Sequence, residues 1–125
     1  MTVLVDVESP YNGPDEATIR RNIRYARACV RDSLMRGEVP FASHLLYTQP
    51  GILDDRIESE RAHGIAAGKA LMAQCSLTAV YMDLGMSRGM EFGVAEATVA
   101  GRAIEYRTLG PSWMDGEDPT REGWR

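Results

Sequence analysis

The sequence has few residues suited to metal sites or disulfide frameworks, since it contains only two histidines and two cysteines. His44 and His63 do not have the spacing of zinc-binding residues, so we expect no metal ion and no other cofactor. Cys29 and Cys75 fall in predicted helices without a close partner in the sequence. We therefore expect reduced, half-buried thiols, as is usual in a cytoplasmic protein.

Long apolar runs are also absent. No stretch approaches the roughly 20 residues that span a membrane, and Asp6 and Glu8 interrupt the apolar run near the N-terminus, which excludes a signal peptide. We therefore expect a cytoplasmic protein with no membrane partner. The net charge of −4 argues against a nucleic-acid partner. The arginines between Arg20 and Arg31 are expected to form a solvated helix face.

Motifs of several common enzyme classes are missing. The sequence has no G-x-S-x-G elbow and no P-loop lysine motif, which excludes the corresponding serine hydrolases and P-loop NTPases. Gly85-x-Ser87-x-Gly89 does not match the G-x-G-x-x-G fingerprint of dinucleotide-binding proteins.

What is present is an alternation of strands and helices. Strands are predicted at residues 2–7, 39–43, 77–82 and 103–107, and helices at about 15–36, 54–74 and 88–100. Asp15 or Thr18 is a suitable N-cap for the first helix and Ser87 for the last, and Gly101 is a suitable left-handed C-cap. This order predicts one α/β domain over residues 1–109 with a mostly parallel sheet of four to five strands.

The predicted helices have recognisable inner faces. Apolar residues at helical spacing predict that the first helix buries Ile19, Ile23, Ala26, Val30 and Leu34. The second is predicted to bury Ile57, Gly64 or Ile65, Gly68, Leu71 and Cys75, and its small residues indicate a close approach to another element. The tail, residues 110–125, is rich in proline, glycine and acidic residues. It is predicted to be mobile or packed on a neighbouring subunit, with Trp113 and Trp124 as anchors.

Polar side chains gather in three loops at the carboxyl ends of predicted parallel strands, where open α/β sheets bind ligands. These loops run over Glu8–Asn12, Ser43–Gln49 and Asp83–Met90. Carboxylates, hydroxyls and a histidine beside helix N-termini suit a phosphorylated, sugar-bearing small molecule. Backbone N–H groups would hold the phosphate, carboxylates would bind the sugar hydroxyls, and Tyr11 or Tyr47 could stack on a base.

The same residues also have structural interpretations. Glu8 can cap the end of the first strand, His44 can bond to the backbone, and Ser87 can serve only as a helix cap. The helix dipole already explains Glu91 in a first helical turn. Asp83 follows a buried strand, which favours a functional role.

Several pieces of the sequence, in this order, resemble one family. They are Ser9-Pro10-Tyr11, then Asn22 and Ala26 in the first helix, Pro40-Phe41-x-x-His44-x-x-Tyr47, and Ser87-x-Gly89-Met90. Across residues 3–107 the chain resembles the nucleoside 2-deoxyribosyltransferase-like superfamily, most closely its small bacterial and phage members of unassigned function.

The resemblance implies a flavodoxin-like or Rossmann-like, three-layer, doubly wound sheet that binds a nucleoside or nucleotide and assembles as a homodimer or larger homo-oligomer. Active members cleave an N-glycosidic bond through a glutamate nucleophile. A nearby aspartate assists the leaving base, and Asp83 is the nearest candidate here. The implied substrate-binding residues are Ser9, Pro10, Tyr11, Asn12, His44, Tyr47, Ser87, Gly89 and Met90.

The sequence departs from this family at the nucleophile. Relatives carry the glutamate three residues after Gly-Met, a position that is Gly93 in this chain. Glu91 lies about 200° away around the helix, and Glu96 lies deeper along it. Either Glu91 or Glu8 reaches the sugar, or the covalent chemistry is lost. The catalytic candidates are Glu91, Glu8 and Asp83.

Two functions from different classes are consistent with these residues. One is a nucleotide N-glycosidase or deoxyribosyltransferase. The other is a catalytically inactive binder that senses or sequesters a signalling nucleotide, which Gly93 favours because it removes the nucleophile. A third possibility is a subunit whose helices serve only assembly.

Overall fold

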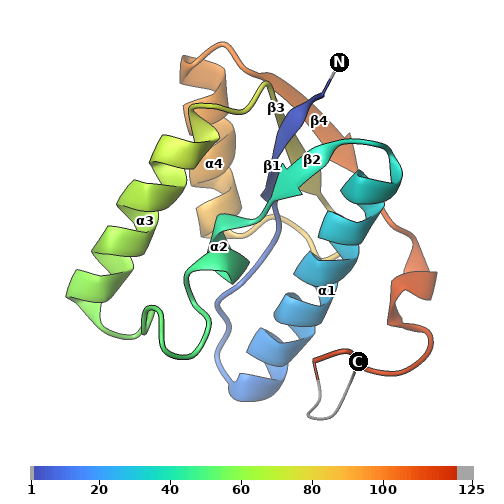
Figure 1. Cartoon of the computed structure of the whole chain (residues 1–125). Helices are drawn as coiled ribbons and strands as arrows, with labels where there is room; N and C mark the ends of the chain where they lie inside the picture. Colours follow the sequence, from blue (N-terminus) through green and yellow to red (C-terminus); the bar gives the residue numbers. More distant parts are fainter. Residues whose placement is uncertain (1, 121–125) are drawn as a thin grey trace.

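The computed structural model describes residues 2–120 and contains one four-stranded, all-parallel sheet in the order β2-β1-β3-β4. The helix of residues 16–35 covers one face of the sheet, and the helices of residues 58–72 and 88–99 lie on the other (Figure 1). This is the three-layer, doubly wound, flavodoxin-like α/β fold that the sequence predicts. In chain order the elements are β1 (Leu4–Glu8), α1 (Glu16–Met35), β2 (Val39–Phe41), α2 (Ser43–Leu46), α3 (Glu58–Met72), β3 (Leu77–Tyr81), α4 (Arg88–Val99), β4 (Ala103–Arg107) and the 3₁₀ turn η1 (Pro111–Met114).

Local signals fix the start of α1 and both ends of α4 as predicted, whereas α3 begins at Glu58, later than the predicted residue 54. The Asp15 side chain accepts a hydrogen bond of 2.7 Å from the backbone N–H of Thr18 at the start of α1. Ser87 does the same for the N–H of Met90 at the start of α4, at 3.2 Å. Gly101, just after α4, has a φ of +70°, which a residue with a side chain adopts at a cost.

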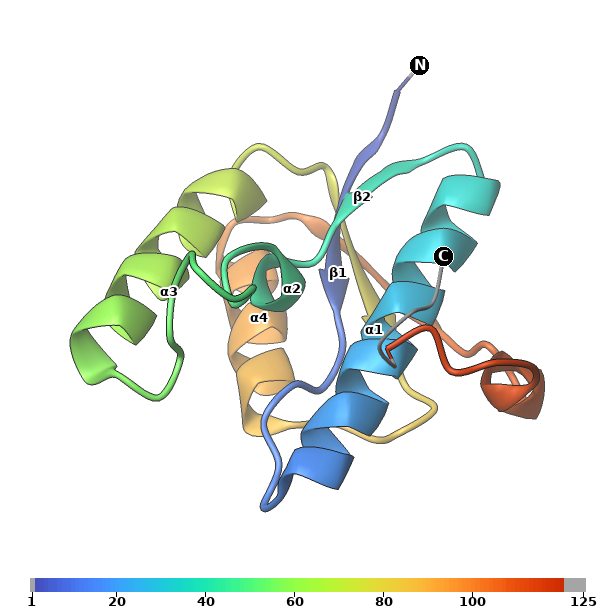
Figure 2. The ribbon, with the colours of Figure 1, turned by 60° about the horizontal axis from the view of Figure 1, so that its bottom comes forward.

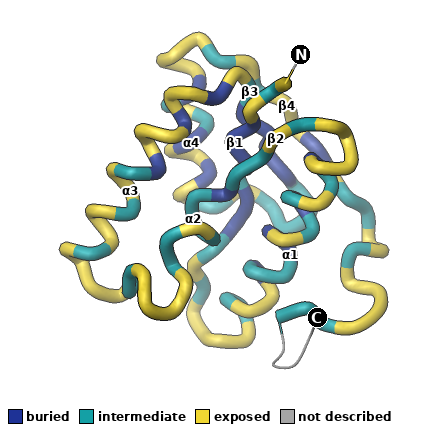
Figure 3. The backbone as a smooth tube through the Cα atoms, viewed as in Figure 1, coloured by how far each residue is buried: buried dark blue, intermediate teal, exposed yellow. Residues whose placement is uncertain are grey.

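The buried faces of α1 and α3 differ from the predicted ones. In α1 the buried face is rotated, and Leu34 is 51% exposed. In α3, Ile57, Ile65 and Leu71 are exposed, and the outward side of the helix is mostly solvent-accessible (Figure 3). Ala26, Gly68 and Cys75 are buried as predicted. The buried residues that were not predicted are Asn22, Tyr25, Cys29 and Ser33 in α1, and Met72 in α3.

The short helix α2 replaces the loop predicted after β2. A Cβ atom at Gly68 would lie 3.0 Å from Cβ of Ser43, so the glycine lets α3 pack directly on α2. The close approach predicted from the small residues of this helix is therefore confirmed, with α2 as the neighbouring element.

Alternation along β1 separates the two faces of the sheet. Val5 and Val7 belong to the apolar core with Tyr25 and Tyr81, on the α1 side. Asp6 and Glu8 point to the opposite face, under α3 and α4, where Thr78 of β3 is also buried. One face of the central strand is therefore apolar and the other carries two carboxyl groups.

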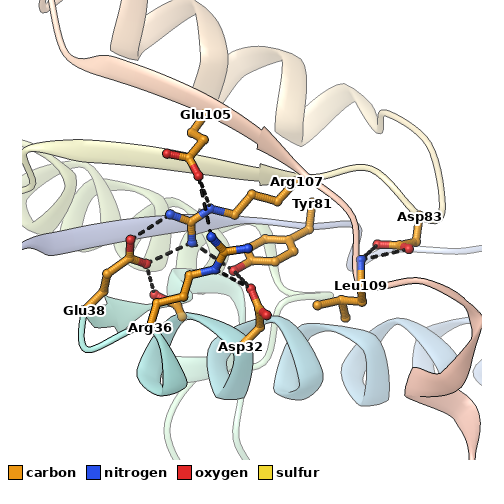
Figure 4. A network of polar contacts seen from close by, with 9 residues as sticks. Asp32, Arg36, Glu38, Tyr81, Asp83, Glu105, Arg107 and Leu109 are labelled. Atoms are coloured by element: carbon orange, nitrogen blue, oxygen red, sulfur yellow. Dashed lines mark hydrogen bonds and ion pairs between the residues drawn. The ribbon is translucent and has the colours of Figure 1, made fainter.

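A buried arginine ties the edge strand β4 to the α1 side (Figure 4). Arg107 donates hydrogen bonds of 2.9 and 2.7 Å to the two carboxylate oxygens of Glu38, and one of 3.0 Å to the Tyr81 hydroxyl. It also donates to Glu105 at 2.9 Å, and Tyr81 donates to Asp32 at 2.8 Å. Because the Arg107 side chain is 2% exposed, these partners supply the charge and the acceptors that burial requires.

Within the described residues, the tail packs on α1 of its own chain as far as Thr120 (Figure 2). Trp113 makes an edge contact with Tyr25, with ring centroids 4.9 Å apart. Arg24 donates to the carbonyl oxygens of Met114, Gly116 and Glu117, and Arg27 donates to that of Pro119. These two arginines therefore bind the tail; Arg24 is partly buried, whereas Arg27 is still exposed. The predicted anchor Trp124 lies outside the described residues.

No helix within residues 2–120 combines the length and apolar character needed to cross a membrane. Cys29 and Cys75 are free thiols, and both are buried rather than half-buried.

Candidate functional site

A cleft of about 710 Å³ opens where β1 and β2 end, between α2, α3 and the first turns of α4. Its volume is typical of sites for small molecules. Most of the predicted site residues line the cleft, and they come from the loop after β1, from α2 and its C-terminal end, and from the N-terminus of α4. These are Glu8, Ser9, Tyr11, Asn12, His44, Tyr47, Ser87 and Gly89.

Asp83 is not among the residues that line the cleft. Its carboxylate accepts hydrogen bonds from the Tyr25 hydroxyl at 2.5 Å and from the backbone N–H groups of Leu109 and Gly110. Burial raises the pKa of Asp83, but these hydrogen bonds outweigh it and leave the pKa below its usual value. Asp83 therefore fixes the chain after β4 against α1.

Glu91, Met90 and Pro10 also do not line the cleft. Glu91 is exposed on α4. Met90 is fully buried, and its sulfur accepts a hydrogen bond of 3.4 Å from the backbone N–H of Ser87. Pro10 is a buried residue of the loop after β1. The structure thus separates Glu91 from Glu8, the two alternatives for the catalytic glutamate.

The Glu8 carboxyl group occupies the space beside Gly93. A Cβ atom added at Gly93 would lie 2.5 and 2.7 Å from the two carboxyl oxygens of Glu8, well inside van der Waals contact. Glycine at position 93 therefore allows the side chain from β1 to reach the surface of α4. A carboxyl group is present at the wall of the cleft where residue 93 would place its own side chain.

Burial is the largest influence on the Glu8 carboxyl group and raises its pKa well above the usual value. The charge of Asp6, on the same face of β1, raises it further, while the charge of Arg102 lowers it. Thr78 donates to Asp6 at 3.2 Å and accepts from Nε of Arg102 at 2.9 Å. The carboxyl group in the cleft is therefore backed by a buried polar chain.

His44 and Ser9 form a second polar group in the cleft. Nε2 of His44 lies 2.8 Å from Oγ of Ser9, and the ring meets the edge of the Tyr11 ring at a centroid distance of 6.1 Å. Burial lowers the pKa of His44 to about 4, so its ring is neutral at pH 7. A neutral imidazole can both donate and accept, which suits recognition of sugar hydroxyls or a base edge.

Three residues that sequence reasoning did not assign to the site contribute to it. Asn22 donates a hydrogen bond of 2.9 Å to the carbonyl oxygen of Tyr11 and so holds the loop after β1. Lys69 and Glu96 form an ion pair of 3.1 Å on the cleft wall. Asn22 had a signal in the sequence, a polar residue within the resembling segments, whereas the ion pair depends on the packing of α3 on α4.

Within the described part of the chain, no group of three or more histidine, cysteine or acidic residues is placed to hold a metal ion.

Comparison with solved structures identifies the class of fold. The chain is similar to the 2-deoxyribosyltransferase from the psychrotolerant bacterium Bacillus psychrosaccharolyticus, with a TM-score of 0.58 over 84% of this chain and 72% of that one. Because the sequence identity is only 11%, this similarity shows the fold alone. That fold is the flavodoxin-like fold of nucleoside deoxyribosyltransferases. The chain belongs to a family described as a domain of unknown function (DUF7768), whose model matches residues 3–107.

Proposed function

We propose that this protein binds a nucleoside or nucleotide in the cleft and cleaves or transfers at its N-glycosidic bond, with Glu8 as the nucleophile. The observation that carries the proposal is the Glu8 carboxyl group beside Gly93. By resemblance, relatives carry their catalytic glutamate at that position. The fold shared with a 2-deoxyribosyltransferase supports a nucleoside substrate.

The chemistry requires an ionised Glu8. One carboxylate oxygen attacks C1′ of the sugar, the C1′–N bond breaks, and its electron pair leaves with the base. Water then attacks C1′ of the glycosyl ester in hydrolysis, or a second base does so in transfer, and Glu8 is released as a carboxylate. Tyr11 or Tyr47 would stack on the base, and His44 would contact the sugar or base edge.

The start of α4 is the proposed phosphate-binding part of the cleft. Ser87 and Gly89 lie at the helix N-terminus, where free backbone N–H groups and the helix dipole attract anions. Arg88 also lines the cleft and adds a positive charge. A 5′-phosphorylated (deoxy)nucleoside fits this arrangement of a carboxyl group at one end and positive charge at the other.

A second candidate function is that of a nucleotide binder without turnover. The observation that favours it is the raised pKa of Glu8, because a protonated carboxyl group is a weak nucleophile. Such a protein would sense or sequester a nucleotide in the same cleft.

We also propose that the protein is a homodimer or larger homo-oligomer, with no nucleic-acid or membrane partner. Phe92 and Val99 on α4 are 68% and 90% exposed. Phe92 also lines the cleft, so a second copy packed on this helix would border the site. Light scattering on the purified protein should give the mass of at least two chains, and a monomer would contradict this part of the proposal.

Thermal denaturation with a panel of ligands tests the nucleotide site. Binding to the native state raises the melting midpoint as the ligand concentration increases. At least one nucleoside, 5′-monophosphate or other nucleotide should raise it, and His44→Ala should weaken that effect. If no member of the panel raises the midpoint, the cleft is not a nucleotide site.

A further inference from the structure

Asp6 is a buried carboxyl group that the proposed reaction leaves without a role. It is 0% exposed on the central strand β1, on the face that packs under α3 and α4. Its Oδ1 atom is buried and meets no hydrogen-bond donor among the described residues. A buried carboxylate oxygen without a donor is costly, so a proton is expected nearby.

Glu8 is the group that can supply this proton. Glu8 follows Asp6 by two residues on the same face of the strand, and the two side chains are within hydrogen-bonding reach. Two ionised carboxylates cannot donate to each other, whereas a carboxylic acid can donate to a carboxylate.

The other oxygen of Asp6 has fixed partners. Thr78 donates to Oδ2 of Asp6, and Nε of Arg102 donates to the Thr78 hydroxyl. Arg102 also donates to the carbonyl oxygen of Met72 at 3.0 Å. This chain holds the Asp6 side chain in place and brings a positive charge toward it from the strand end opposite to the cleft.

We propose that Asp6 is a positioning residue for Glu8, and that the two carboxyl groups hold a single proton between them. The sharing of the proton is a property of the chain itself, whereas its use in catalysis rests on the proposed function.

The charged groups that face Asp6 and Glu8 favour a state in which the two carboxyl groups keep one proton. Arg102 faces the pair from the start of β4, and Glu96 faces it from α4. Glu96 is neutralised by its ion pair with Lys69 of α3. Of the remaining neighbours, His44 of α2 is neutral at pH 7, and burial raises the pKa of Cys75 to about 11, so its thiol is neutral as well. Two carboxyl groups with one proton then balance the single charge of Arg102.

Proton sharing gives Asp6 a defined part in glycosyl transfer. As the Glu8 oxygen attacks C1′, the shared proton passes to Asp6, and the electron pair of the broken C1′–N bond leaves with the base. The intermediate then contains a neutral ester beside a neutral Asp6, so no carboxylate is left in the buried pair. Release of the sugar returns the carboxylate to Glu8 and the shared proton to the pair.

The experiment is a ¹³C NMR titration of side-chain carboxyl groups in the full chain without ligand. Coupled groups each show both steps of the pair, whereas independent groups show one. The variants are Asp6→Asn, which removes one partner, and Thr78→Val, which removes the donor to Asp6. Asp55→Asn is the control, since Asp55 also lines the cleft but is not among the groups that influence Glu8.

In the unmodified protein, Glu8 and Asp6 should each titrate in two steps. Asp6→Asn should leave a single step for Glu8 with its midpoint lower by about one pH unit or more, because the neighbouring negative charge is gone. Thr78→Val should also lower the midpoint of the Glu8 titration. Without the Thr78 donor the Asp6 carboxylate is less stable, so Asp6 holds the shared proton more of the time and Glu8 ionises more easily. Asp55→Asn should change neither.

Single, independent steps for both groups in the unmodified protein would overturn the proposal, as would an unchanged Glu8 titration in Asp6→Asn. Because the measurement uses no substrate, this failure is distinct from failure of the proposed function. That function fails instead if no nucleotide binds while the two carboxyl groups still titrate as a pair.

Discussion

The carboxyl group of Glu8 and the backbone of Gly93 are so close that a side-chain carbon at residue 93 would overlap the carboxyl group. The two residues come from β1 and α4, elements separated by most of the chain. In this protein the carboxyl group therefore reaches the wall of the cleft from a strand, whereas by resemblance relatives place it on the helix. The position of the Glu8 carboxyl group therefore requires a glycine at residue 93.

This pairing predicts non-additive effects on stability. Gly93→Ala should destabilise the protein by about 1–3 kcal/mol, because the new methyl group forces the Glu8 side chain out of its position. In a Glu8→Ala background the same change should cost little or stabilise, since alanine is the better helix former. Urea denaturation of the four proteins in the cycle measures the coupling.

Gly89→Ala is the matched control for this cycle. A Cβ atom at Gly89 would have only Oγ of Ser87 nearby, at 3.9 Å, so this change should not depend on residue 8. Equal costs of Gly93→Ala in the two backgrounds would show that Glu8 does not occupy that space.

Glu8→Gln should stabilise the protein increasingly as the pH rises. The folded state raises the pKa of Glu8 above its usual value of 4.5, so ionisation is unfavourable in the folded protein. The stability that the protonated form contributes is fully present below pH 4.5 and is lost as the pH rises through the folded pKa. Glutamine does not ionise, and its amide can donate to Asp6.

Melting midpoints at acidic, neutral and mildly alkaline pH test this prediction. The midpoint of Glu8→Gln should exceed that of the unmodified protein by more as the pH rises. Above neutrality the difference should correspond to about 1–3 kcal/mol in the free energy of unfolding. Glu91→Gln, at an exposed carboxyl group outside the cleft, is the control for the loss of one negative charge. A gain that is the same at every pH would mean that Glu8 ionises in the folded protein as easily as in water.

Asp83→Asn should destabilise the protein and leave the cleft unchanged. The Tyr25 hydroxyl and the N–H groups of Leu109 and Gly110 lose a charged acceptor, at a cost of about 1–3 kcal/mol near pH 7. The folded pKa of Asp83 lies below its usual value of 3.8, so its contribution is present above pH 3.8 and is lost as the pH falls through the folded pKa.

Denaturation of both proteins between pH 7 and pH 2 checks the Asp83 prediction. The difference in stability should shrink at the acidic end of this range. Unchanged stability together with loss of nucleotide binding would place Asp83 in the site after all.

Arg24→Ala should release the end of the tail from α1. Arg24 supplies the donors to the carbonyl oxygens of Met114 and Gly116, and no other side chain of α1 bonds to these two. Limited proteolysis should cut within residues 114–120 faster in this variant, with little change in the melting midpoint. Arg31→Ala, an exposed arginine on the same helix, is the control. Equal cleavage rates in the two variants would contradict the assigned role.

The fold could be predicted because its signals are local. Strand runs, the Ser87 cap and the glycine at 101 act within a few residues, and all of them are found in the structure. The buried face of α1 could not be predicted in full, because some of its buried residues are polar and bond to residues far away in the sequence. Tyr25 is buried since its hydroxyl meets Asp83, 58 residues away, and hydrophobic periodicity does not detect such a pair.

The candidate site was predicted in outline for a similar reason. The parallel sheet brings the loops after β1 and β2 together, so their residues were found as a group. The choice between Glu8 and Glu91 depends on which side chain reaches Gly93. That contact depends on how α4 packs on the sheet, which no sequence spacing gives.

The most direct test of the account is release of free base. The protein is incubated with a mixed pool of nucleosides, 5′-monophosphates and their deoxy forms, and the products are separated by chromatography. If Glu8 is the nucleophile, free base appears with the unmodified protein, is abolished in Glu8→Gln and is unchanged in Glu91→Gln. Base release that survives in Glu8→Gln would contradict Glu8 as the nucleophile. No release from any substrate, with an unchanged nucleotide recovered from the denatured protein, would make this chain a binder.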